Sequence, residues 1–402
     1  MRILHVTPYY EHAWAYGGIP RIVTALAGEL VRRGHSVTVC TTDVSTADAR
    51  LKRPNGTRKF KPWQESDRRG VDVRVFPNLS NRLAYDLQFF VPFGLASYLE
   101  ACTGEFDIAH LHACHNLPTV IAARYLANAD VPYVLMPNGT APRIERRRVA
   151  KLVFDVAVGR HVLPRAARLI AVSEAERAQL HAMRVPDERI AVIPNPSNLD
   201  EFAAPIERGR FRRRFGLDGE LVMFLGKLTP RKRLDVLARA FASLDRPAAR
   251  LVIVGNDMGY REELDRLVDV LGIANRTICT GLIAGRDRLE ALADADVVVY
   301  PSQDEIFGLV PIEAILCGTP VVVADDSGCG EVISRVGGGR VVAQGSVTEL
   351  AQAIASVLDA PGQWRHAAAD AASRAREWYA AAPVCTQLEH VYRDVIAQSR
   401  RT

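Results

Sequence analysis

The chain alternates short apolar runs with amphipathic stretches from its first residues onward. Residues 2–7 form a strand-like run, a loop with Gly17 and Gly18 follows, residues 20–33 carry apolar side chains at helical spacing, and residues 35–42 return to a strand-like run. A strand, a helix and a second strand in this order form a right-handed βαβ unit by default. Continued alternation of this kind predicts a parallel sheet covered by helices.

The same pattern starts again in the second half. A turn-rich break at residues 195–200 precedes a new apolar strand at residues 221–225. The total of 402 residues exceeds the size at which a single core usually stops growing. We therefore predict two doubly wound, Rossmann-like α/β domains, and we expect the binding site in a central cleft between the carboxyl ends of their strands. The predicted parts are residues 1–197, residues 198–383, and a final helix at about 384–402 that packs back onto the first domain.

The composition excludes several classes of protein. A net charge of +5 gives no reason to expect a nucleic-acid partner. The seven cysteines are scattered and lack a CxxC pair, which favours reduced thiols in the cytoplasm over disulfides or a zinc site. No apolar run reaches the ~20 residues needed to span a bilayer. We expect a cytoplasmic protein whose contact with a membrane, if it has one, is peripheral.

Two carboxylates, Glu305 and Glu313, follow an apolar run at residues 296–300. The run predicts a buried strand, so Glu305 should lie in the loop at its carboxyl end, where open α/β sheets bind ligands. Pro311 suits the start of the next helix, which would put Glu313 in the first turn of that helix. Free N–H groups there would bind an anion. An acidic loop before an acidic helix is also common without a ligand, and the segment alone fits both interpretations.

A basic loop follows the first strand of the second half. Residues 226–233 contain Lys227, Arg231, Lys232 and Arg233. Several cations at the carboxyl end of a strand suit a diphosphate, whose negative charge must be neutralised when it leaves. A solvated basic turn is the alternative interpretation.

Histidines end a strand of the first half. His110 and His112 close the run at residues 108–112 and should point to the same face, and His115 lies in the loop beyond. His112 could hydrogen-bond a sugar hydroxyl, although a single histidine is often structural. The loop with Gly17 and Gly18 lets the backbone approach a ligand.

Other familiar motifs are missing from the sequence. It contains no GxGxxG fingerprint, no Walker loop, no HExxH and no cluster of cysteine and histidine in sequence. We therefore expect neither a nicotinamide cofactor nor a catalytic metal. A basic segment with interleaved apolar residues spans residues 143–168, and it fits either a patch for an anionic lipid or pyrophosphate or simply a solvated helix.

With these motifs in place, the chain resembles the retaining nucleotide-sugar glycosyltransferases of the GT-B fold, family four, also called glycosyl transferases group 1. The resemblance runs nearly end to end and depends on the order and spacing of its motifs. These motifs lie at residues 17–18, 34–39, 108–112, 171–174, 193–195, 226–233, 281, 301–302, 305–313 and 318–322.

The resemblance implies a role for each matching residue. Glu305, His112 and Lys232 would act at the reacting centre, with Glu305 and His112 near the donor sugar and Lys232 on the phosphate. Glu313 would hold the ribose hydroxyls. The remaining donor-binding positions would be Gly17, Gly18, Lys227, Phe307, Gly308 and Leu309, the last three through backbone N–H groups.

Two positions depart from the family pattern. Lys227 stands where the family usually has arginine, which keeps the charge but loses the bidentate fork. Arg233 stands where glycine is usual, which raises a question about the backbone of that loop.

The activity implied by the resemblance is transfer of a sugar from a nucleoside diphosphate sugar to an acceptor hydroxyl, with retention at the anomeric carbon and without a metal or other cofactor. A UDP-sugar is the favoured donor and GDP-mannose the next. The acceptor would be a sugar or a lipid-linked saccharide, chosen by the loops at residues 9–19 and 45–70. The expected setting is bacterial exopolysaccharide, O-antigen or other glycoconjugate synthesis at the inner face of the membrane. The alternatives are a nucleotide-sugar-binding protein without transferase activity and a phosphorylase-like enzyme of similar architecture.

Overall fold

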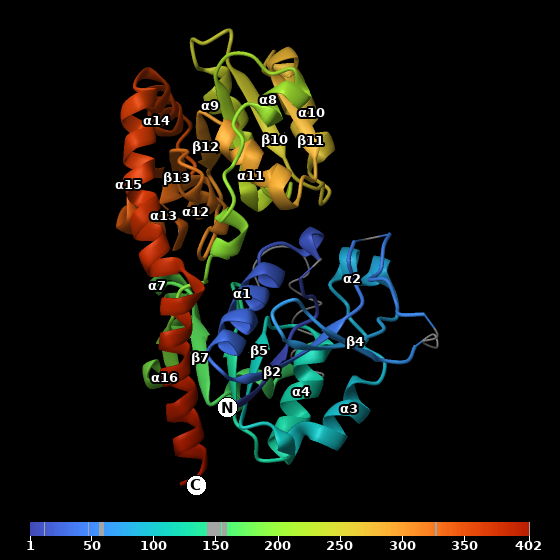
Figure 1. Ribbon diagram of the computed structural model, residues 1–402. Coiled ribbons are helices and arrows are strands. Elements are labelled where there is room, and N and C mark those ends of the chain that lie inside the picture. The colour runs from blue at the N-terminus through green and yellow to red at the C-terminus, as the bar shows by residue number, and fades with distance from the viewer. Residues whose placement is uncertain are drawn as a thin grey trace. The chain divides into compact units, whose positions relative to one another are not determined.

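The computed structural model divides into two compact units (Figure 1). Unit 1 comprises Met1–Pro196 and Ala381–Thr402, and unit 2 comprises Ser197–Ala380. The structure describes the chain except for residues 12, 47, 56–59, 143–153, 155–158, 326–327 and 402, together with the side chain of residue 14. Each unit is built on its own parallel sheet, which confirms the predicted α/β class.

The sheet of unit 1 has eight strands in the order β3-β4-β2-β1-β5-β6-β7-β8. Every neighbouring pair is parallel except β3 and β4. The strands are β1 (Arg2–Val6), β2 (Ser36–Thr42), β3 (Trp63–Ser66), β4 (Asp72–Phe76), β5 (Ile108–His112), β6 (Tyr133–Met136), β7 (Arg168–Ala171) and β8 (Ile190–Val192). The main helices are α1 (Ile19–Arg32), α2 (Asn81–Leu87), α3 (Leu95–Cys102), α4 (Leu117–Asn128), α6 (Val162–Arg165) and α7 (Glu174–Ala182).

Strand β3 corrects the prediction that residues 45–70 form only a surface loop. It pairs antiparallel with β4 at the edge of the sheet. Of its four residues only Trp63 is buried, and the other three are exposed. A strand this polar lacks the apolar alternation by which strands are recognised in a sequence.

The last helix, α16 (Ala381–Ser399), belongs to unit 1 and packs against α1 (Figure 1). His35 Nε2 lies 2.9 Å from Glu389 Oε1, and Arg33 donates to the carbonyl oxygen of Ala382 at 2.5 Å. Tyr392 is fully buried. The chain therefore begins and ends in the same unit.

The sheet of unit 2 has six strands in the order β11-β10-β9-β12-β13-β14, all parallel. They are β9 (Leu221–Leu225), β10 (Arg250–Val254), β11 (Thr277–Gly281), β12 (Val297–Tyr300), β13 (Val321–Asp325) and β14 (Gly339–Ala343). The chain builds outward from β9 in one direction and from β12 in the other. The neighbours β9 and β12 therefore form the topological switch point, where ligands bind to open sheets of this kind.

Helices flank the sheet of unit 2 (Figure 1). They are α8 (Arg210–Phe215), α9 (Leu234–Ala242), α10 (Arg261–Val270), α11 (Gly285–Asp294), α12 (Leu309–Leu316), α13 (Gly328–Val336), α14 (Val347–Asp359) and α15 (Pro361–Tyr379). No helix in the described part of the chain is both long and apolar enough to cross a membrane.

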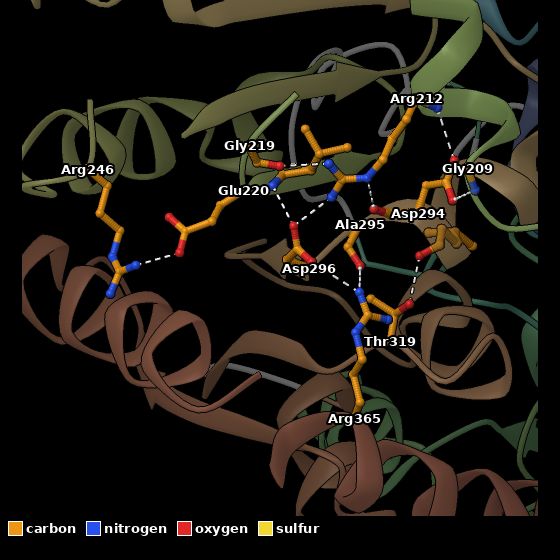
Figure 2. A network of polar contacts seen from close by, with 12 residues as sticks. Gly209, Arg212, Gly219, Glu220, Arg246, Asp294, Ala295, Asp296, Thr319 and Arg365 are labelled. Carbon is orange, nitrogen blue, oxygen red and sulfur yellow. Dashed lines mark hydrogen bonds and ion pairs between the residues drawn. The ribbon is translucent and has the colours of Figure 1, made fainter. Parts of the chain in front are cut away.

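A polar network fastens two of these helices to the amino end of β12 (Figure 2). The Asp294 carboxylate accepts the backbone N–H groups of Gly209 and Arg212 where α8 begins. The neighbouring Asp296 pairs with Arg212 of α8 at 2.7 Å and with Arg365 of α15 at 3.1 Å. The network holds β12 at its amino end, opposite to the loop at residues 301–308 that leaves its carboxyl end.

Candidate functional site

The site in unit 2 is formed by two loops that leave neighbouring strands. Residues 226–233 follow β9 and residues 301–308 follow β12. The N–H of Gln303 donates to the carbonyl oxygen of Arg231 at 2.8 Å. Arg231 Nη1 in turn donates to the carbonyl oxygen of Asp304 at 2.9 Å. These bonds tie the two loops together at the carboxyl edge of the sheet.

Lys232 and Glu305 form an ion pair at this edge, in which Lys232 is buried and Glu305 is half-buried. Lys232 ends a short 3₁₀ helix and is 6% exposed, and its Nζ also donates to the hydroxyl of Tyr300 at 2.7 Å. The ammonium lies 4.6 Å from the centroid of the Tyr300 ring. Tyr300 therefore joins Lys232 and Glu305 in this cluster, although the sequence predicts it only as the last residue of a buried strand.

The charges around this pair favour an anion. Burial alone would raise the pKa of Glu305, but Lys232 and Arg231 outweigh that effect and the pKa lies below its usual value. Burial lowers the pKa of Lys232, and Glu305 acts in the opposite direction. Two cations, Lys232 and Arg231, therefore act on one ionised carboxylate.

Glu313 lies on α12 and is 6% exposed. The helix begins at Leu309, two residues before the start predicted at Pro311, so Glu313 is its fifth residue rather than part of its first turn. Its carboxylate pairs with Arg288 of α11, and Arg288 also pairs with Glu201. Neither of these partners was identified in the sequence, since no motif connects them with Glu313.

The turn before α12 depends on glycine. Gly308 has a φ of 78°, and a Cβ atom there would lie 2.5 Å from the Sγ of Cys329. The Phe307 ring is turned into unit 2, where it packs edge-to-face on Tyr379 with 5.4 Å between centroids. The ring is therefore not available to a ligand, and the backbone contacts predicted for Phe307 and Leu309 stay predictions.

The unusual Arg233 adopts the backbone conformation that explains the glycine common at this position. Its φ is 49° and its ψ is 43°, in the left-handed region. A residue with a Cβ atom is disfavoured there by roughly 1–2 kcal/mol. The Arg233 guanidinium pairs with Asp235 at 3.1 Å, which offsets part of that cost. Lys227, in the same loop, is half-buried.

In unit 1, His112 is fully buried at the end of β5. Its Nε2 lies 2.9 Å from the Nδ1 of His5, and the rings of His110 and His112 stack at 4.1 Å, which confirms that they share a face. His110 Nδ1 contacts the hydroxyl of Tyr392 at 2.6 Å. Burial, and then the charge of His5, hold the pKa of His112 well below its usual value, so the ring is neutral at physiological pH.

These three histidines are also a candidate metal-binding group. The nitrogen atoms of His5, His110 and His112 lie within 4.8 Å of one another, and no other group of this kind occurs in the part of the chain that the structure describes. Gly17, with a φ of 102°, and Gly18, the N-cap of α1, form the loop after β1.

The remaining candidates are less informative. His115 follows β5, and its Nδ1 contacts the carbonyl oxygen of Thr140 at 2.8 Å. Most of the basic segment at residues 143–168 lies outside the described residues, which include residue 154 and continue from residue 159.

Two α/β units, each built on a parallel sheet, have the architecture of the GT-B glycosyltransferases. The Glycosyltransferase Family 4 profile matches residues 16–201, and the Glycosyl transferases group 1 profile matches residues 206–378. A D-inositol 3-phosphate glycosyltransferase of Mycolicibacterium smegmatis is 31% identical over 363 residues, which are 85% of this chain and 79% of that relative. The protein therefore belongs to glycosyltransferase family four, as its motifs predicted.

Solved structures agree with the GT-B fold. HepE from Anabaena, in complex with UDP, aligns over 98% of this chain and 100% of its own with a TM-score of 0.73 and 21% identity. WaaG, a glycosyltransferase involved in lipopolysaccharide biosynthesis, aligns over 98% of this chain and 99% of its own with a TM-score of 0.64 and 19% identity.

Proposed function

We propose that the protein is a retaining glycosyltransferase that moves a sugar from a nucleoside diphosphate sugar to an acceptor hydroxyl, with a UDP-sugar as donor in preference to GDP-mannose. The observation that carries this proposal is the contact of Lys232 with Glu305 and Tyr300 between the loops of β9 and β12. The complex of HepE with UDP supports the choice of nucleotide.

In the proposed mechanism, unit 2 holds the leaving diphosphate. Lys232 and Lys227 neutralise its charge, and the N–H groups at the start of α12 add a partial positive charge. Glu313 accepts hydrogen bonds from the ribose hydroxyls, and Glu305 from the donor sugar. The neutral imidazole of His112 is suited to hydrogen-bond a sugar hydroxyl rather than to act as a fixed charge.

The transfer step itself is proposed to be a front-face displacement. The bond between the anomeric carbon and the phosphate oxygen breaks, and the acceptor oxygen forms its new bond on the same face of the sugar. The leaving phosphate takes the proton of the acceptor hydroxyl, so no enzymic nucleophile and no metal are needed.

The donor and the stereochemistry can be tested together. In a thermal-shift screen of UDP- and GDP-sugars, the matching donor at 100 times its Kd should stabilise the protein by about 2.7 kcal/mol. With that donor, nuclear magnetic resonance of the first-formed product should show the anomeric configuration of the donor. Turnover should persist in excess EDTA.

The donor, the stereochemistry and the metal-independent step can each be contradicted separately. Stabilisation by no nucleotide sugar would contradict the donor assignment. An inverted product would contradict retention, and loss of turnover in EDTA that is restored by one divalent metal would contradict the metal-independent step.

We propose a sugar or lipid-linked saccharide as the acceptor, in exopolysaccharide, O-antigen or other glycoconjugate assembly in the cytoplasm. The role of WaaG in lipopolysaccharide biosynthesis supports this setting. The name of the mycobacterial relative favours a second candidate, a phosphorylated polyol. Assays with both acceptor classes and one donor would separate the two, since only the correct class should yield a glycosylated product.

We also propose a peripheral contact with the inner face of the membrane through apolar side chains on and around α2. Leu79, Leu83, Leu87 and Phe89 are 36–51% exposed. Burying a fully exposed leucine is favourable by about 1.5–3 kcal/mol, and about a third to a half of that applies to Leu83 and Leu87, which are 36% and 51% exposed. Replacing Leu83 and Leu87 by serine should therefore lower the bound fraction at least tenfold in flotation with phosphatidylglycerol vesicles. Val270→Ser, at an exposed position of unit 2, is the control, and equal binding of both variants would contradict the contact.

A further inference from the structure

Arg288 is a buried cation between two carboxylates. It is the fourth residue of α11 and is 3% exposed. Its Nη1 donates to Oε2 of Glu313, and its Nη2 donates to Oε2 of Glu201. Glu201 comes from a 3₁₀ helix at Leu199–Phe202, so three separate segments of unit 2 meet at this guanidinium.

The chemistry of the guanidinium matches this arrangement. Burial disfavours the charge of Arg288, but Glu313 and Glu201 outweigh that effect and raise its pKa. Arginine presents several N–H donors in one rigid plane, so the two contacts, Nη1 on Glu313 and Nη2 on Glu201, set where one carboxylate oxygen of each residue lies relative to the other. Lysine would keep the charge as a single point without that plane.

The ion pair is not what holds α11 to α12. Leu289 and Leu292 of α11 are buried in the core, as is Ile312 of α12. The hydroxyl of Thr319, just after α12, also donates to the carbonyl oxygen of Leu292 at 2.8 Å. Because a buried ion pair adds little stability compared with apolar side chains of similar size, packing alone does not account for an arginine here.

We propose that Arg288 is a positioning residue that fixes the Glu313 carboxylate for the ribose of the donor, with Glu201 holding the far side of the guanidinium. The proposal rests on the proposed function, in which Glu313 holds the ribose hydroxyls. Carboxylate orientation matters for this contact because the hydroxyls of a ribose have fixed directions. A carboxylate that rotates would bind them less well, while contacts to the base and the phosphates would be unaffected.

The test measures how much the ribose hydroxyls contribute to binding. Titration calorimetry would give the Kd of UDP and of 2′,3′-dideoxy-UDP for the full-length protein and for Arg288→Gln. In the wild type, loss of the hydroxyls should weaken binding about tenfold or more, since hydrogen bonds to a charged group are strong. In Arg288→Gln this ratio should fall to about threefold or less. Arg286→Gln, at a more exposed position of the same helix, should keep the wild-type ratio.

The outcomes separate the proposed role of Glu313 in binding the ribose from the proposed role of Arg288 in positioning Glu313. If the wild type binds neither nucleotide, or binds both equally, the proposed function of Glu313 fails. If the wild type discriminates and folded Arg288→Gln keeps the same ratio, only the positioning role fails. Should Arg288→Gln not fold, Arg288→Lys replaces it: an intermediate ratio supports the proposal and an unchanged ratio overturns it.

Discussion

Replacing Lys232 by alanine should lower kcat/KM by about 10²–10³-fold, the loss typical when one charge-stabilising donor is removed from an active site. Lys232 is buried and lies against Glu305 and Tyr300, so its removal takes a positive charge out of the interior of the site. Because the positive charge matters most as the diphosphate leaves, kcat should fall more than the affinity for the donor. Steady-state kinetics with a saturating acceptor would separate the two effects.

The variant also leaves Glu305 without its buried cation. Removing one partner of a fully buried pair costs about 3–5 kcal/mol, and the cost is smaller here because Glu305 is half-buried. The loss of activity must still be separated from a loss of folded protein. Lys232→Met keeps the volume of the side chain, and the double variant Lys232→Met with Glu305→Gln removes both charges. Both should remain inactive while the double variant regains stability. Arg266→Ala, at a residue 72% exposed on α10, is the control. Turnover within threefold of the wild type in folded Lys232→Ala would contradict the assignment.

The parts of the fold that followed from the sequence are those in which burial leaves a clear pattern. The run at residues 297–300 is buried on both faces, and the structure has β12 there. β3 was missed because it is largely exposed and polar at the edge of its sheet. Edge strands are stabilised by pairing on one side only, and that pairing is not visible in local sequence.

The residues of the candidate site also fall into those that the sequence could predict and those that it could not. Lys232 and Glu305 could be brought together because parallel strands end at one edge of a sheet, so a motif after β9 and a motif after β12 must be neighbours. Arg288 and Tyr300 could not be placed in the site from the sequence. Both reach the site from within a helix or a strand whose pattern is that of core, and their contacts depend on packing between elements. The start of α12 was also placed two residues late, since Pro311 is tolerated anywhere in a first turn where N–H groups lack helical partners.

Unit 1 should lose stability steeply as the pH falls below about 6.5, because of the three buried histidines. Burial lowers the pKa of His5 to about 3 and holds those of His110 and His112 well below their usual value. In the unfolded chain each would titrate near 6.5, so the unfolded state binds more protons below that pH. Stability is therefore fully present above about pH 6.5 and falls by up to about 1.4 kcal/mol per pH unit for each histidine.

One buried acid acts in the opposite direction. Burial raises the pKa of Glu176 to about 7, so the folded state takes up a proton there before the unfolded state does. Between pH 6.5 and 5 this offsets about one of the three histidines, which leaves a net loss of roughly 2–3 kcal/mol per pH unit. Hydrogen exchange of the amides of β1 and β5, followed by mass spectrometry, would report the stability of unit 1 separately from that of unit 2.

Two histidine variants would show whether the three buried histidines cause this pH dependence. His5→Asn keeps a hydrogen-bonding group near Nδ1 but cannot titrate, so the slope between pH 6.5 and 5 should fall by about 1.4 kcal/mol per pH unit. His366→Gln removes a histidine that is 83% exposed on α15, and it should leave the slope unchanged. Equal slopes in the wild type and His5→Asn would mean that the cluster is not the cause. A smaller slope in His5→Asn would support the burial of the three histidines and the neutral state of His112 at the pH of the reaction. The proposed contact of His112 with a sugar hydroxyl requires that neutral state.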